Sequence, residues 1–239
     1  MTLLPTSTAT RLGGPAAADE PRTGAALVAG AASFWAAWAL MPGVGIVDPR
    51  HIFAIVAERR GLVALSVVLQ LVSAALYAPA IVGLAADPRV NRRPVRLAAT
   101  LLAIGAMGSA ADAVLHLLAY AMTAPGLDRE AQVPVMAFMQ GPGLRLLTPL
   151  LLAFFAGGAW LSVAFARAGL VARWNVRAHP LALGVAVIGV ALAGVGAVLP
   201  ARLAGLTALG LVSAAHVGVG LALYRLPGRQ PLSPEGLAS

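Results

Sequence analysis

Apolar residues in this chain are gathered into six long blocks, separated by short polar connectors rich in Pro, Gly and Arg. Each block is long enough to cross roughly 30 Å of hydrocarbon as an α-helix. Pro and Gly follow several of the blocks, where they end helices. The pattern predicts an all-α fold, a polytopic membrane bundle of six transmembrane helices at about 23–41, 61–86, 97–123, 144–168, 181–199 and 203–224.

Composition supports the same class of protein. Hydrophobic residues make up 59% of the 239 residues and charged residues only 11%, whereas soluble domains carry about 25% charged residues. We therefore expect one transmembrane domain, residues 23–226, between disordered cytoplasmic tails at 1–22 and 227–239. A sizeable soluble domain has no room in this chain.

The distribution of arginine predicts the orientation. The chain has 17 basic residues, all Arg, and a net charge of +8. Eleven of them fall on the side of the two termini and six on the other side. The positive-inside rule then puts both termini in the cytoplasm, and the Arg-rich, Lys-free composition suggests a bacterial inner membrane. Because the arginines sit at block ends, we expect the lipid bilayer as partner and no nucleic acid.

Two longer connectors, 42–60 and 124–143, lie on the outer side in this topology. Within them, residues 49–60 and 128–139 can each form a short interfacial helix, although Pro134 would interrupt the second. Together these helices would cover the outer end of the bundle.

The third block carries a polar stripe in an otherwise apolar helix. At about 100° per residue, its four polar residues share an arc of roughly 80°; they are Ser109, Asp112, His116 and Tyr120. A charge at the bilayer centre costs about 2.5–3.5 kcal/mol, so such groups usually face a protein interior or a wet cavity. The stripe is therefore the candidate polar intramembrane site.

His216 is the distant partner that the sequence offers for this stripe. Residues 109–120, SAADAVLHLLAY, are echoed by residues 213–224, SAAHVGVGLALY, so that Asp112 aligns with His216. The echo suggests a 3+3 inverted repeat of the kind found in transporters, or a chance match between Ala- and Leu-rich helices. An Asp112–His216 pair near the midplane is feasible if the third and sixth helices pack together.

Four interpretations of these residues remain open. They can form a hydrogen-bonded seam between helices, a proton relay in a small transporter, or a haem b site held by His116 and His216. A metal site of Asp112, His116 and His216 is the fourth. His51 and His179 are assigned to loops, the chain has no Cys, and neither a metal nor another cofactor is predicted.

One stretch resembles a known family. Arg60-Gly61-Leu62, Leu76-Tyr77 and Val90-Asn91-Arg92, within residues 58–93, are similar to an uncharacterised family of small bacterial six-helix integral membrane proteins. The resemblance implies six helices and no particular activity.

The leading functional expectation is a small inner-membrane protein without catalytic activity of its own, acting as an accessory or assembly partner of other membrane proteins. A proton-coupled transporter of a small molecule, using the buried Asp and His residues, is the alternative. A haem- or quinone-binding redox subunit is the third class.

Overall fold

The computed structural model describes residues 20–46, 48–87, 90 and 92–226, and these are helical apart from short turns. The described residues contain eight α-helices and one π-helix. They are α1 (Glu20–Leu40), α2 (Pro49–Glu58), α3 (Arg60–Ala86), α4 (Arg93–Met122), α5 (Arg129–Phe138), η1 (Met139–Gly143), α6 (Leu144–Arg167), α7 (Arg173–Gly194) and α8 (Val198–Arg225).

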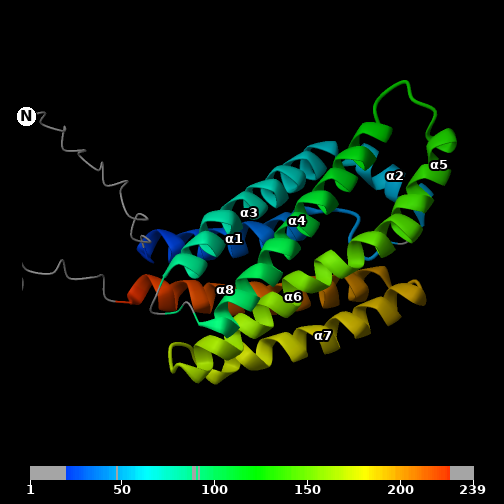
Figure 1. The fold of residues 1–239 in the computed structure, drawn as a ribbon. Helices are drawn as coiled ribbons and strands as arrows, with labels where there is room; N and C mark the ends of the chain where they lie inside the picture. Colours follow the sequence, from blue (N-terminus) through cyan, green and yellow to red (C-terminus); the bar gives the residue numbers. More distant parts are fainter. Residues whose placement is uncertain (1–19, 47, 88–89, 91, 227–239) are drawn as a thin grey trace, which may run out of the picture.

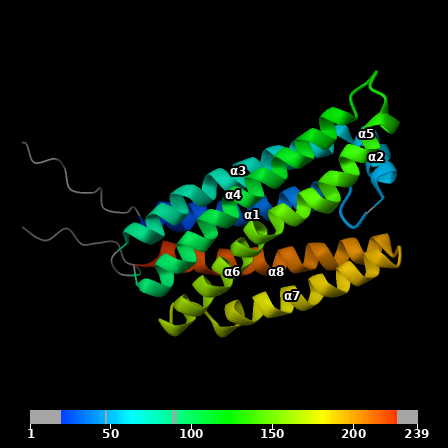
Figure 2. The same ribbon diagram turned by 45° about the vertical axis from the view of Figure 1, so that its right-hand side comes forward.

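The long helices form one bundle (Figure 1). α1 packs between α3 and α8, α4 packs between α3 and α6, and α7 packs chiefly on α8. α1 begins and α8 ends at one end of the bundle, whereas α2 and α5 lie at the other (Figures 1 and 2). The two ends of the described chain therefore share a side, as an even number of spans requires.

Within the described residues, six helical segments are long and apolar enough to cross a membrane, which agrees with the predicted number of spans. The fourth predicted span is the second half of a continuous helical segment, because η1 joins α5 to α6 without a turn. The suggested 3+3 repeat stays a prediction.

The boundary between the last two spans was predicted wrongly. The sequence placed the turn at residues 200–202, but α7 ends at Gly194 and α8 begins at Val198. Gly196, with φ of 75°, makes the turn, because glycine adopts positive φ without strain. Pro200 lies in the first turn of α8, where a helix does not need the missing N–H. The earlier start of α7 at Arg173 also puts His179 inside a helix instead of a loop.

Two further assignments need correction, one at the start of α1 and one in the first connector. α1 begins at Glu20, so residues 20–22 belong to a helix and not to the expected tail; residues 1–19 and 227–239 lie outside the described residues. His51 lies in α2 and not in a loop.

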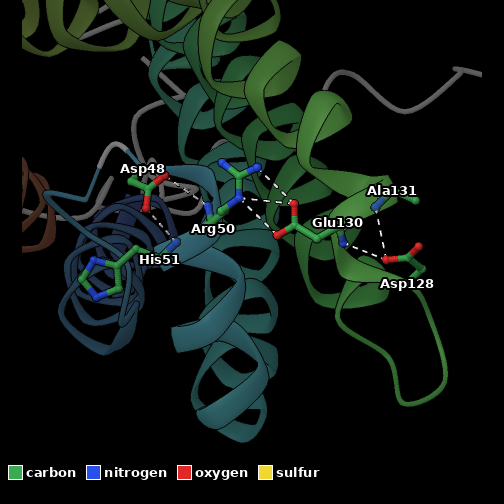
Figure 3. Close-up of polar contacts among 6 residues, drawn as sticks. All are labelled: Asp48, Arg50, His51, Asp128, Glu130 and Ala131. Carbon is green, nitrogen blue, oxygen red and sulfur yellow. Dashed lines mark hydrogen bonds and ion pairs between the residues drawn. The ribbon is translucent and has the colours of Figure 1, made fainter.

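Both predicted connector helices are present as α2 and α5, and Pro134 is accommodated inside α5. Asp48 caps α2 by accepting from the backbone N–H groups of Arg50 and His51, and Asp128 caps α5 in the same way (Figure 3). The Arg50 guanidinium donates to both carboxylate oxygens of Glu130 at 3.1 Å, and this bond raises the Arg50 pKa. We call this pair of helices the cap.

Close helix contacts in the bundle depend on glycine. A Cβ atom at Gly105 of α4 would overlap the backbone of Phe154 in α6, and one at Gly157 would lie 2.7 Å from the backbone nitrogen of Leu102. Small residues let membrane helices approach closely. This contact brings the Phe154 ring into the bundle centre, where it meets the rings of Phe34, Tyr77 and His216.

Candidate functional site

Two groups of polar side chains lie inside the bundle, and each contains buried residues. The capped-end cluster, next to the cap, comprises Trp38, Gln70, Asp112 and His116. The histidine cluster comprises Tyr77, His179 and His216, from α3, α7 and α8. Each is built from helices that lie far apart in sequence.

Asp112 is the central residue of the capped-end cluster. Its side chain is 10% exposed, and its ionisable neighbour is the His116 ring, with Oδ2 and Nδ1 3.7 Å apart. His116 Nδ1 lies 3.3 Å from Gln70 Oε1. Because an amide oxygen only accepts, this nitrogen carries a proton in that bond. The Trp38 indole and the His116 ring form a T-shaped contact with their centroids 5.5 Å apart.

A cavity of about 270 Å³ opens beside these side chains and beneath the cap. Trp38, Asp112 and His116 line it from the bundle, and Met136 and Gln140 line it from the α5–η1 segment. Gln140 Oε1 is buried without a hydrogen-bond partner among the described residues. Gln140 lies in the π-helix, an element that often occurs at functional sites. The cavity is thus lined by a carboxylate, an indole and an amide, which belong to Asp112, Trp38 and Gln140.

The four-residue stripe of α4 is divided between several environments. Asp112 and His116 face each other within the capped-end cluster. Tyr120 lies under Arg60, whose guanidinium carbon is 3.9 Å from the ring centroid and whose Nη1 donates to the Tyr120 carbonyl at 2.9 Å. Ser109 is buried and, among the described residues, makes no hydrogen bond to the other three.

His216 belongs to the other cluster. Its Nδ1 lies 2.6 Å from the Tyr77 hydroxyl, and its ring also meets Phe154 and His179. α8 packs on α1 and α7, while α4 packs on α3 and α6. Among the described residues, no hydrogen bond, ion pair or ring contact joins His216 to Asp112 or to His116, the two partners that the sequence suggested for the midplane pair and for haem.

A polar stripe on α3 links the two clusters and was missed in the sequence. Ser66 donates to the Ala37 carbonyl at 2.7 Å, and Ser73 donates to the Gly30 carbonyl at 2.8 Å. Gln70 Nε2 donates to Ser66 Oγ at 3.3 Å, and Tyr77 holds His216. The spacing of residues 66, 70, 73 and 77 is that of one helix face, so a search for neutral polar residues at helical period would have found it.

The fold and the six long apolar helices indicate the class of protein, a multi-pass α-helical membrane protein. No protein-family model, curated protein or solved structure matches the chain. The function must therefore be argued from the two clusters themselves.

Proposed function

We propose that the protein is a proton-coupled carrier of small organic cations, and that the cation binds in the cavity beneath the cap. The observation that carries this proposal is the set of residues that line the cavity: Asp112 with its carboxylate, Trp38 with its indole, and Gln140, whose buried Oε1 has no hydrogen-bond partner among the described residues. An ammonium group donates hydrogen bonds and carries no acceptor. It is also attracted to the face of an indole. The remaining walls, which include Met41, Met136 and Met139, suit short alkyl substituents.

Coupling to protons follows from the position of Asp112. Among the described residues it is the only acid away from the ends of the six long helices. An isolated carboxylate at such a depth is costly, so it is either protonated or matched by a cation. A proton and an organic cation therefore compete for the same carboxylate. This competition supports exchange of one for the other, with the cap end facing outward and both termini in the cytoplasm of a bacterial inner membrane.

The test is binding of methylammonium and tetramethylammonium to the purified full-length protein, measured by calorimetry and by tryptophan fluorescence. Asp112→Asn keeps the size of the side chain and removes the charge, so we expect it to abolish binding. The matched control is Asp128→Asn, which changes an exposed acid in the cap. Binding of neither cation to the wild type, or equal binding to Asp112→Asn, would contradict the proposal.

Transport is tested in proteoliposomes whose lumen is more acidic than the outer buffer. In an exchanger, protons that leave the vesicle drive uptake of the cation. Uptake of labelled tetramethylammonium, which has no neutral form that could cross the bilayer unaided, should follow the gradient in the wild type and fall to the level of empty vesicles in Asp112→Asn. Binding without gradient-driven uptake would reduce the proposal to a cation-binding protein. The accessory role and the haem- or quinone-binding role stay predictions of the sequence.

A further inference from the structure

The two imidazoles of the histidine cluster have free nitrogens in a dry part of the bundle. His216 is fully buried and His179 is 8% exposed. Nε2 of each ring is buried without a hydrogen-bond partner among the described residues. Buried polar atoms in native proteins are nearly always paired, so two neighbouring exceptions need a cause such as a bound ion or water.

Both free nitrogens point to one place. A Cβ atom added to Gly158 of α6 would overlap His216 Nε2 and would lie 3.1 Å from His179 Nε2. The two ring centroids are 6.0 Å apart. Two imidazoles that share one metal ion through bonds of about 2.0–2.1 Å have centroids roughly 5 Å apart in a tetrahedral arrangement and roughly 6.4 Å apart in a linear one. The observed separation lies between these two values.

The opposite nitrogen of each ring has a hydrogen-bond partner, as it has in metal-binding histidines. His179 Nδ1 lies 3.2 Å from the Asn175 carbonyl oxygen, which only accepts. Nδ1 therefore carries the proton, and Nε2 of the neutral ring has a free lone pair. His216 Nδ1 lies 2.6 Å from the Tyr77 hydroxyl oxygen, and metal binding through Nε2 requires Nδ1 to carry the proton and donate it to that oxygen. Such second partners orient the ring and set its tautomer in metal sites.

Further oxygen donors are near the same helices. The hydroxyls of Ser162 and Ser213 are also buried and unpaired within the described part of the chain. Helical spacing puts Ser162 on the face of Gly158 and Ser213 on the face of His216. Neither serine carries a negative charge. The described side chains of this cluster are therefore all neutral ligands, and none of them balances the charge of a bound ion.

We propose that His179 and His216 bind a single Cu(I) ion through their Nε2 atoms. Imidazole is a good ligand for copper, and Cu(I) accepts two neutral ligands without a charged one. A divalent ion would bring twice the charge into the membrane with no carboxylate to balance it, which is much more costly. The absence of a group of three or more His, Asp or Glu ligands among the described residues fits a two-coordinate ion. The proposal is independent of the cation site beneath the cap.

The test is Cu(I) titration of the purified full-length protein under reducing conditions, in competition with a chromophoric chelator. We expect one ion per chain. His179→Gln and His216→Gln should each remove tight binding, whereas the control His116→Gln, which lies in the capped-end cluster, should keep it. Tyr77→Phe should weaken binding about 10- to 100-fold, because the ring loses its second partner.

The ligands of the ion can also be identified in the wild type, without any variant. X-ray absorption of the copper-loaded protein should show two nitrogen ligands with the outer-shell scattering of imidazole. Absence of stoichiometric Cu(I) binding, binding that survives both histidine substitutions, or a spectrum without imidazole scattering would overturn the proposal. Tight Zn(II) binding that depends on both histidines, without Cu(I) binding, would overturn the choice of metal.

Discussion

Tyr77 and His216 are 139 positions apart in the chain, yet their side chains share a buried hydrogen bond of 2.6 Å that joins α3 to α8. Both residues are almost fully buried. The bond connects two helices that do not otherwise pack closely. It therefore fixes the position of α8 relative to the polar stripe of α3.

Tyr77→Phe should destabilise the protein by about 1–3 kcal/mol, because the substitution leaves His216 Nδ1 buried without its partner. The phenyl ring keeps the packing against Phe154, so little cavity forms. Thermal unfolding in detergent or lipid nanodiscs measures the change. Tyr224→Phe is the matched control, since Tyr224 is 57% exposed. Equal stability of the two variants would show that the Tyr77 bond contributes nothing.

Gly158→Ala should be destabilising, by about 1–3 kcal/mol, because the added methyl group overlaps the ring of His216. Gly184→Ala in α7 is the comparison, since a Cβ there meets no atom within 4 Å. Alanine favours helix over glycine by up to about 1 kcal/mol. The two substitutions should therefore change the unfolding temperature in opposite directions. A stable Gly158→Ala protein would mean that His216 moves freely.

The number of spans followed from the sequence because apolar blocks of this length have one stable state in a membrane. The two connector helices followed as well, since Asp48 and Asp128 are good N-caps. The turn before α8 did not follow, because proline ends one helix or begins the next with the same local signal. Gly196, which adopts positive φ in that turn, was the residue that marked its position.

The candidate site was predicted in part. The pairing of Asp112 with His116 is local, at i and i+4, so the sequence contains it. The partner of His216 depends on which helices pack against α8. The helix surfaces are almost uniformly apolar, so the sequence does not show which helices pack together. His179 was missed because the predicted span began two residues after it. Gln70 and Tyr77 were missed because neutral polar residues and tyrosines were considered only on the helix that carries Asp112, although such groups need partners on every membrane helix.

The N-caps of the cap helices should contribute more to stability than the ion pair between them. Asp128→Ala removes a side chain that accepts from Glu130 N at 3.0 Å and from Ala131 N at 3.3 Å, and caps are worth about 0.5–2 kcal/mol. Arg50→Gln breaks a solvent-exposed pair, and such pairs contribute little. Unfolding of both variants at low and high salt tests this. A larger loss for Arg50→Gln would contradict the ranking.

The topology can be tested directly because the chain contains no cysteine, so single-cysteine variants need no altered background. Leu127→Cys lies between α4 and α5 and is 49% exposed, and Ala168→Cys lies between α6 and α7, where it is also exposed. The arginine distribution puts the first outside and the second in the cytoplasm. A membrane-impermeant maleimide applied to intact cells should label Leu127→Cys only, and both variants after permeabilisation. The reverse pattern would invert the orientation while leaving six spans, whereas labelling of both in intact cells would contradict the assignment of the two loops to opposite sides.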